Sequence, residues 1–566
     1  MIGAAAARRA ERLWIPAGLL ILLYGCLGPI TNRDLFLHLA LGKAILSAGS
    51  LPRVDFLSWT RAGEPWINSE WLTQLLYVRL EQVAGLCGLI VLKTLCMAGA
   101  ALCLERVLHR RGAAPAVRAA AIAAFAAAVA GNNDVRPENF SVLGFAAELL
   151  LLERLRDGRR LAWPAAAAIA GAFTALWANL HGEFVLGLAL GACYAAEAFA
   201  KGRPDRRIFA ALFAAGLAAS LATPYGWSIY RFILGHAIDS EALQRIVIEW
   251  RRPGFDNVLN WPFWGLLAVQ ACLLALPAVR RRLAALHWII LAGLGYSAAS
   301  HRRLIPFFVL AALAYSAGVL EPQDARPAVR RRVSLACAAV LASAVWLFAA
   351  NVPAGWMRSP IQPGIFPEKA ADFLGRHRNA LGRLAFYNPW GWGGYLEYRL
   401  FPDYRVFADG RFELFGALYA EESASTVRPG HWREFLDRHA ADLVLLKRHQ
   451  PDITQRRIRP DGSVETETRP YYLFFMAQDR WRLIYWDSNS LLFARAGAAS
   501  PAWEAAHRYR WLHPGDNAAL RRAALAGVIA KEGLREELCR HVSEAGPDDE
   551  AAELAALAGG DAGCVR

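Results

Sequence analysis

The sequence has little charge for its length, and this scarcity is the first guide to its class. Of 566 residues, 20% are charged and 55% are hydrophobic, and the mean hydropathy is +0.23. This balance excludes a disordered or fibrous chain and is more apolar than an ordinary soluble protein. The charge that is present is uneven, with 63 Lys and Arg against 49 Asp and Glu and a formal net charge of +14.

The residue patterns of several common sites are also missing. No Ser/His/Asp arrangement and no Cys/His spacing typical of a metal site stands out. Seven of the nine cysteines lie in or beside apolar runs, where a thiol behaves as a small hydrophobe. Cys539 and Cys564 lie in a polar region, and whether they pair, which requires an oxidising compartment, stays open.

Two stretches of the C-terminal region resemble functional loops on first inspection. Residues 388–394 are rich in glycine but lack the G-x-G-x-x-G spacing, so we interpret them as tight-turn glycines beside packed tryptophans. Residues 409–411, Asp-Gly-Arg, follow a strand-like run and could contact an acceptor. A turn closed by an internal ion pair is the interpretation we favour.

The apolar residues are gathered into long runs. Stretches such as 162–180 and 333–350 carry no charge over the roughly 20 residues that a helix needs to cross about 30 Å of hydrocarbon. We therefore predict a polytopic α-helical membrane protein with about eleven transmembrane helices. The expected spans are roughly 13–30, 84–104, 117–131, 139–153, 162–178, 184–200, 208–223, 262–279, 284–300, 304–320 and 333–351.

Basic residues concentrate in alternate breaks between these runs, such as 154–160 and 326–332. By the positive-inside rule these breaks and the N-terminus are cytoplasmic. Membrane orientation thus explains much of the positive charge, and no nucleic-acid partner is expected. Because the number of spans is odd, the chain after about residue 352 is expected outside, which in a bacterial inner membrane means the periplasm.

This topology predicts three parts. Residues 1–351 form the transmembrane module, with external loops 31–83 and 224–261. Residues 352–500 alternate amphipathic helical pattern with short strand-like runs, which predicts an external α/β domain. Residues 501–566 have helical spacing and turn signals about one tetratricopeptide period apart, which predicts a helical tail of that repeat type. The strand-like runs are 384–387, 406–408, 443–446, 483–486 and 491–494.

Ionisable residues gather at the external mouths of the spans. They are Asp34 after the first span, Asp134, Arg136 and Glu138 in the second external loop, and His181 and Glu183 in the third. Taken alone, Asp34 is equally well explained as a solvated helix end. Ionisable groups at membrane level are costly, however, and three such clusters on one side are expected to form one site.

A second set of basic residues lies on the external side, against the charge rule. These are Arg251, Arg252, His301, Arg302 and Arg303. Two explanations stay open for the arginines, which either pair with external carboxylates or bind an anionic phosphate near the lipid headgroups. A carboxylate base together with phosphate-binding arginines fits the transfer of a group from a lipid phosphate to an external acceptor.

Several stretches carry a resemblance to a known superfamily. They are Asp34-Leu-Phe-Leu-His38, Gly49-Ser-Leu-Pro-Arg-Val-Asp55, Trp66-Ile-Asn-Ser-Glu-Trp71, Arg136-Pro-Glu138, Trp177-Ala-Asn-Leu-His-Gly182, Pro224-Tyr-Gly226, Glu249-Trp250, Trp392-Gly-Gly-Tyr395 and Asp409-Gly-Arg411. Over nearly the whole chain to about residue 500, the sequence resembles a bacterial group of multi-span, glycosyltransferase-like proteins. Its architecture is similar to the GT-C superfamily, which includes protein O-mannosyltransferases, the lipid A aminoarabinose transferase and the catalytic subunit of oligosaccharyltransferase.

The resemblance implies a polyprenyl-phosphate sugar donor and a carboxylate of the first external loop as catalytic base or metal ligand. By position that role falls to Asp34, with Asp134 and Glu138 as a second acidic site. The sequence has no Asp-x-Asp, and Asn32 stands where a second acid is expected. A requirement for Mg²⁺ or Mn²⁺ therefore stays open, with these three carboxylates as its ligands if one is bound.

We therefore predict an inverting GT-C-type glycosyltransferase with Asp34 as general base. Its acceptor, whether glycan, lipid or protein, is left open. The residues expected to bind substrate or its phosphate are Arg136, His181, Glu183, Arg251, Arg252, His301, Arg302 and Arg303.

Two alternatives remain. A transporter or flippase of a lipid-linked or anionic substrate needs ionisable groups near mid-membrane, where Lys93 is the clearest example. A non-catalytic cell-envelope assembly protein would bind a protein partner through the helical tail.

Overall fold

The computed structural model describes residues 2–158, 161–238, 244, 247–280, 283–316, 327–351, 359–458 and 461–557. The chain divides into two compact units. The first, the helical unit, comprises Met1–Asn32, Leu41–Leu51 and Ile67–Gln362. The second, the α/β unit, comprises Arg33–Ala40, Pro52–Trp66 and Pro363–Arg566. Two pieces of the expected first external loop thus belong with the C-terminal region.

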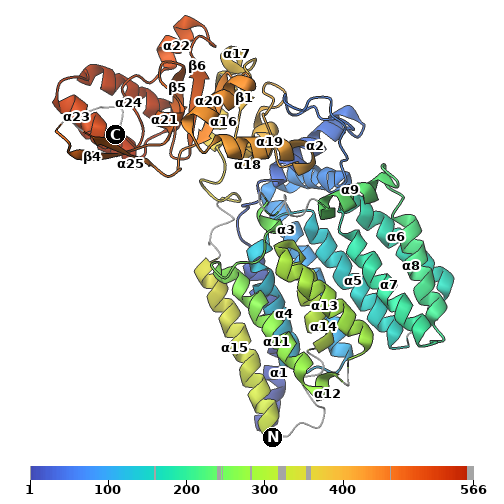
Figure 1. The fold of residues 1–566 in the computed structure, drawn as a ribbon. Helices are drawn as coiled ribbons and strands as arrows, with labels where there is room; N and C mark the ends of the chain where they lie inside the picture. The colour runs from blue at the N-terminus through green and yellow to red at the C-terminus, as the bar shows by residue number, and fades with distance from the viewer. Residues whose placement is uncertain are drawn as a thin grey trace. The chain divides into compact units, whose positions relative to one another are not determined.

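The helical unit is built from long apolar helices that run side by side (Figure 1). They are α1 (Ile2–Cys26), α3 (Trp71–Arg110), α4 (Pro115–Val129), α5 (Glu138–Arg156), α6 (Trp163–Leu180), α7 (Phe184–Ala200), α8 (Arg206–Ala219), α9 (Ser228–Ile238), α11 (Trp261–Ala275), α12 (Pro277–Arg280), α13 (Ala285–Ser300), α14 (Ile305–Ser316) and α15 (Pro327–Asn351). Each of the eleven expected spans coincides with one of these helices. Helix α2 (Leu35–Ala48) contributes to both units.

Four helical segments in the described residues are long and apolar enough to cross a membrane. They are Trp71–Arg110, Pro115–Asn132, Val258–Ala275 and Ala328–Asn351. Shorter apolar helices occupy Arg12–Cys26, Leu35–Ala48, Phe184–Ala200 and Ala285–Ser300. The chain is therefore a helical membrane protein, and the number of eleven crossings stays a prediction.

Helix α4 lies at the centre of the helical unit, packed against α1, α11 and α15. Its alanines allow close approach, because small side chains let helix backbones come together in a membrane. A Cβ added at Gly18 of α1 would lie only 2.9 Å from the Ala119 carbonyl oxygen. Small residues on both helices thus determine this contact.

Helix α3 is kinked at Gly85, whose φ of 62° is readily adopted only by glycine. The kink coincides with the start of the expected span 84–104. The part of α3 before Gly85 therefore forms the helical end of the expected loop 31–83, and the part after it forms the span.

The α/β unit has a four-stranded sheet in the order β1-β2-β6-β5. Strand β1 (Phe386–Tyr387) pairs in parallel with β2 (Leu443–Lys447), and β2 pairs antiparallel with β6 (Ser490–Arg495). Strand β5 (Trp481–Trp486) completes the sheet, and β3 (Ile453–Ile458) and β4 (Val464–Arg469) form a separate hairpin. The helices of this region are α16 (Glu368–Arg376), α17 (Arg378–Leu381), α18 (Trp390–Leu400), α19 (Phe412–Ser425), α20 (Pro429–Arg438) and α21 (Tyr472–Phe475).

Four of the five strand-like runs are strands, and the prediction for 406–408 is wrong. Val406 forms only an isolated bridge with Ser58, because its backbone pairs with Leu57 and Trp59 instead of a sheet neighbour. The first-loop piece 52–66 supplies that pairing. A distant segment thus takes the place of the expected strand partner.

The tail contains the helices α22 (Pro501–His507), α23 (Asn517–Leu525), α24 (Lys531–Ala545) and α25 (Asp549–Leu557). It packs into the α/β unit, since His541 stacks on Trp486 at 3.5 Å between ring centroids and Lys369 Nζ donates to the Ala545 carbonyl at 2.7 Å. A tetratricopeptide origin stays a prediction. Cys539 is disulfide-bonded, and Cys564 lies outside the described residues.

Candidate functional site

Ionisable side chains from several helix ends gather in the helical unit. We call this group the acid–arginine cluster. Its members are Glu70, Arg136, Glu138, His181, Glu183, Glu249 and Arg303. Glu70 directly precedes α3, Glu138 begins α5, and Glu183 directly precedes α7. The sequence predicts these ends on the external side, and the structure brings residues of the second and third loops together within this unit.

Glu183 and Arg303 form one ion pair of the cluster. Arg303 Nε donates to Glu183 Oε1 at 3.0 Å, and the guanidinium lies over the Trp250 ring at 4.9 Å. The opposite charge of Glu183 raises the pKa of Arg303, although burial acts to lower it. Arg303 is thus fixed by a carboxylate and an aromatic face together.

His181 connects Glu183 to the start of α3. Its Nδ1 lies 2.8 Å from the Ser141 hydroxyl and 3.5 Å from Glu183 Oε2, and its Nε2 lies 3.3 Å from Glu70 Oε1. Trp177 Nε1 donates to the same Ser141 hydroxyl at 2.7 Å. These contacts fix the imidazole between two carboxylates.

Arg136 and Glu249 form a second ion pair, across 113 residues of sequence. Burial acts to raise the pKa of Glu249, but the charge of Arg136 lowers it to about 2. Glu249 is therefore ionised at neutral pH. Together with the Arg303 pair, this supports pairing as the explanation of the external arginines.

Glu138 directly precedes the expected span 139–153 and faces two other carboxylates. Burial, and then the charge of Glu183, raise the pKa of Glu138 to about 8, against the opposing effects of Arg303 and Arg136. Burial also raises the pKa of Glu183, but Arg303 opposes that rise. Glu138 therefore holds a proton at neutral pH and can donate a hydrogen bond.

Asp134 has its own partners. Its Oδ2 accepts hydrogen bonds from the Thr31 N–H at 2.8 Å and the Thr31 hydroxyl at 2.5 Å, and its Oδ1 accepts from the Val135 N–H at 2.6 Å. These bonds tie the second external loop to the segment after α1. The described contacts of Asp134 are structural.

The remaining predicted basic residues lie beside the cluster. His301 packs edge-to-face with Trp250 at 5.5 Å and lies 3.1 Å from Gln244 Nε2. Arg302 Nη2 donates to the Gly131 carbonyl at 3.0 Å, and Arg251 Nε donates to the Gln244 carbonyl at 3.0 Å. Arg251 and Arg252 are exposed.

Asp34 belongs to the α/β unit, directly before α2. A Cβ added at Gly410 would lie 2.5 Å from Asp34 Oδ1, so the missing side chain at 410 leaves room for this carboxylate. Asp34 is half-buried. The sequence alone does not predict that Asp34 packs against the Asp-Gly-Arg turn, because the two lie far apart in the sequence.

That turn is part of a buried ionic network that sequence reasoning largely missed. Arg411 Nε lies 2.9 Å from Asp409 Oδ1, which confirms the predicted internal ion pair. Arg411 Nη2 also donates to Asp55 Oδ1 at 2.6 Å. Glu397 lies alongside, and burial followed by the charge of Asp409 raises its pKa well above the ordinary value. Nothing in the sequence around residue 397 indicates that this carboxyl is buried.

The chain is similar in fold to several solved structures. No protein-family model and no curated protein matches the sequence. The oligosaccharyltransferase of Archaeoglobus fulgidus, in its apo form, aligns over 84% of this chain and 80% of its own, with a TM-score of 0.51 and 10% identity. The chain has the GT-C fold.

Two further solved structures align less closely. ArnT from Cupriavidus metallidurans, bound to undecaprenyl phosphate, is 12% identical over 86% of this chain and 98% of its own, with a TM-score of 0.48. The mycobacterial arabinofuranosyltransferase AftD is 16% identical over 86% of this chain and 40% of its own, with a TM-score of 0.47. At such identities the GT-C likeness describes the fold alone.

Among the described residues, Asp134 Oδ1 accepts a single hydrogen bond, from the Val135 N–H, and Oδ2 accepts two from Thr31. Burial favours the protonated form of Glu138, and a cation bound there would displace that proton. A separate group of His377, His507 and Glu544 in the α/β unit has ligand atoms within 4.8 Å of one another. There, however, His377 Nδ1 accepts from Trp503 Nε1 at 3.4 Å, which leaves Nε2 protonated in the neutral ring.

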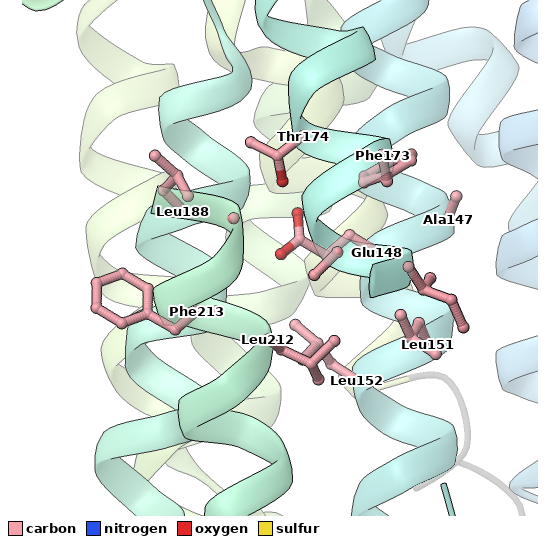
Figure 2. A pocket seen from close by; sticks show the side chains of 13 residues that line it. Ala147, Glu148, Leu151, Leu152, Phe173, Thr174, Leu188, Leu212 and Phe213 are labelled. Atoms are coloured by element: carbon pink, nitrogen blue, oxygen red, sulfur yellow. The ribbon is translucent and has the colours of Figure 1, made fainter. Parts of the chain in front are cut away.

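A cavity of about 230 Å³ lies between α5, α6, α7 and α8, and it contains a carboxylate that the sequence analysis overlooked. Figure 2 shows Glu148 of α5 pointing into this apolar cavity on the side of Thr174. A side chain at Gly187 would clash with the Glu148 carboxylate. Alanines and leucines dominate the sequence on either side, so this single acid does not stand out in the hydropathy pattern.

Proposed function

We propose that the chain is a membrane glycosyltransferase that moves a sugar from a polyprenyl-phosphate donor to an acceptor on the external face. The observation that carries this proposal is the likeness of fold to an enzyme named an oligosaccharyltransferase, over 84% of this chain. Asp34 gives further support. It lies shortly after α1, in the first external loop, where the resemblance of the sequence to GT-C enzymes implies a catalytic carboxylate.

The proposed reaction is an inverting displacement. Asp34 takes the proton of the acceptor hydroxyl, and the acceptor oxygen forms a bond to the anomeric carbon of the sugar. The bond from that carbon to the phosphate oxygen breaks, and polyprenyl phosphate leaves with the electron pair. Cationic side chains stabilise the charge that develops on this leaving group.

Arg251 and Arg252 are the arginines best suited to hold that phosphate. Both are exposed, and they directly follow Trp250, whose ring lies beneath the Arg303 guanidinium. Arg303 and Arg136 pair with Glu183 and Glu249. On the exposure of Arg251 and Arg252 we assign phosphate binding to these two and a positioning role to Arg303 and Arg136.

Glu138 is proposed to orient the acceptor or the phosphate by donating a hydrogen bond. Its raised pKa, about 8, keeps the proton available at neutral pH. His181 and Glu183 line the same cluster. Should a divalent cation such as Mg²⁺ or Mn²⁺ bind, it would supply Lewis-acid stabilisation to the leaving phosphate, with Asp34, Asp134 and Glu138 as the residues that would hold it.

The test is a transfer assay with the full-length protein in lipid nanodiscs. Radiolabelled polyprenyl-phosphate sugars are supplied as donors and an envelope extract as the source of acceptors. We expect label to pass to a water-soluble or lipid product, and Arg251→Met with Arg252→Met to slow transfer by about tenfold or more. A protein that binds the donor without turnover in any condition contradicts the proposal.

The transporter alternative has one observation in its favour. Glu148 places an ionisable group inside the helical unit, and intramembrane carboxylates often mark a transport path. An assay of movement of the lipid-linked donor across a vesicle membrane tests this alternative. Donor movement without transfer would replace the enzyme proposal.

A further inference from the structure

A cavity of about 810 Å³ lies in the α/β unit, outside the residues discussed so far. Its volume falls within the range of small-molecule binding sites, roughly 300–1,000 Å³. Six aromatic side chains border it. They are Tyr387, Trp390, Trp432, Tyr471, Phe474 and Phe475.

The aromatic side chains at the opening present flat surfaces. Trp390, Tyr471, Phe474 and Phe475 are half-buried, so part of each ring remains accessible. The apolar C–H faces of a sugar ring pack against such rings, while its hydroxyls need polar partners nearby. The aromatic lining alone would suit any flat apolar ligand.

Glu422 supplies a polar partner at the wall of the cavity. Its Oε1 accepts a hydrogen bond from the Tyr387 hydroxyl at 2.5 Å. Its Oε2 is buried and has no hydrogen-bond partner among the described residues. An unsatisfied buried oxygen costs free energy, and a ligand hydroxyl that donates to it would remove that cost.

Two cations, Arg33 and Lys447, line the same cavity. Within the part of the chain that the structure describes, neither has a carboxylate within 4.0 Å. Burial, and then the charge of Arg33, lower the pKa of Lys447 to about 8, although the charge of Glu422 acts to raise it. Because the lining holds two cations and a single carboxylate, an anionic group on the ligand is favoured.

The start of α18 reinforces this preference. Pro389, Trp390 and Gly391 line the cavity at the helix N-terminus, where unpaired backbone N–H groups favour anions. A Cβ at Gly391 would lie 3.2 Å from Arg33 Cδ, so the glycine makes room for the arginine side chain. This explains the glycine in a stretch that the sequence analysis interpreted as a tight turn.

Arg33 also relates the cavity to the proposed base. It directly precedes Asp34, and consecutive Cα atoms are only about 3.8 Å apart. Both residues belong to the α/β unit. The Arg33 side chain lines the cavity, and the Asp34 carboxylate lies against Gly410 of the same unit.

We propose that this cavity is the acceptor site and that it binds a saccharide carrying an acidic group. The sugar rings lie on Trp390 and Tyr471, a hydroxyl donates to Glu422, and the acid pairs with Lys447 and Arg33. The identification of this cavity as the acceptor site rests on the proposed glycosyltransferase function. The saccharide site itself rests on the cavity alone.

Binding to the full-length protein in nanodiscs, measured by calorimetry without any donor, tests the site. The probes are a tetrasaccharide of alternating glucuronate and N-acetylglucosamine, its carboxyl-reduced neutral form, and maltotetraose bearing one phosphate. We expect the acidic probes to bind about tenfold more tightly than the neutral one. The carboxylate and phosphate probes distinguish which acid the site prefers.

Three variants and one control assign the contacts. Lys447→Met should remove the preference for the acidic probes. Glu422→Gln should weaken the binding of all three probes, and Trp390→Ala should weaken their binding further. Arg405→Met removes an exposed cation of the same unit that does not line the cavity, and should change nothing. Equal binding of acidic and neutral probes, unchanged binding by Lys447→Met, or no binding of any probe would overturn the proposal.

The two proposals fail in different ways. Tight binding of an acidic saccharide by a protein that transfers no sugar would contradict the glycosyltransferase proposal and leave the site standing. Transfer to an acidic acceptor with an unchanged KM in Lys447→Met would contradict the site and leave the enzyme standing.

Discussion

Arg411 Nη2 lies 2.6 Å from Asp55 Oδ1, although 356 residues separate the two in the sequence. Both side chains are almost completely buried. The Arg411 guanidinium also binds Asp409 and lies 4.8 Å from the Trp66 ring centroid. One arginine thus joins a piece of the first external loop to the C-terminal region, beside the turn that accommodates Asp34.

Breaking this pair should destabilise the protein strongly. Arg411→Met leaves Asp55 and Asp409 buried without a cation, and removing one partner of a buried pair typically costs about 3–5 kcal/mol. Thermal unfolding of the purified protein in detergent measures the loss. Arg438→Met, at an exposed pair with Glu421, is the matched control, and should cost less than about 1 kcal/mol. Equal effects of the two variants would contradict the structural role of Arg411.

Glu422 should make stability depend on pH. Burial raises its pKa from 4.5 to about 7, so between these values the folded chain holds a proton that the unfolded chain releases. The resulting contribution to the free energy of unfolding is at most about 3 kcal/mol. It is complete below pH 4.5 and is lost as the pH rises to 7. Glu422→Gln should therefore show a smaller fall in Tm between pH 5 and 7.5 than the wild type. Parallel pH profiles for the two proteins would refute this assignment.

A substitution at Glu148 distinguishes the glycosyltransferase proposal from the transporter alternative. Glu148→Gln keeps the size of the side chain against Gly187 but removes its charge. Sugar transfer should be unchanged within about twofold, because the proposed chemistry uses groups at the helix ends. Loss of donor movement across vesicles, together with loss of transfer, would favour transport as the primary function.

The helices at the expected spans were predictable because apolar residues gather there into runs with few charges. The strands at 443–446 and 491–494 were predictable for a similar reason, since both are short apolar runs. The run 406–408 shares that composition, but its backbone pairs with the first-loop segment at Ser58. Local pattern carries no information about such a distant partner.

The site was predictable only in part. Polar residues at span mouths identified Glu138, His181 and Glu183, because ionisable groups stand out against apolar surroundings. The partners Glu70 and Glu249 were missed, since pairing across long sequence separations depends on how the helices pack. The Asp34 environment was missed for the same reason, as Gly410 lies in a different part of the chain.

The helical tail should be required for folding of the α/β unit. Deleting 501–566 exposes Trp486, which His541 covers, and removes Glu550, which binds Arg448. We expect the truncated protein to lose expression or to unfold at a lower temperature. A truncated protein that keeps its Tm and its saccharide binding, while losing a protein partner, would instead assign the tail to assembly.

The central claim is that Asp34 is the base of a glycosyl transfer. Asp34→Asn and Asp134→Asn should be compared with the wild type in the nanodisc transfer assay, after equal Tm values show that the proteins are folded. We predict that Asp34→Asn lowers transfer by at least about a hundredfold, whereas Asp134→Asn, whose carboxylate binds Thr31, keeps most of it. Full transfer by folded Asp34→Asn would contradict the account.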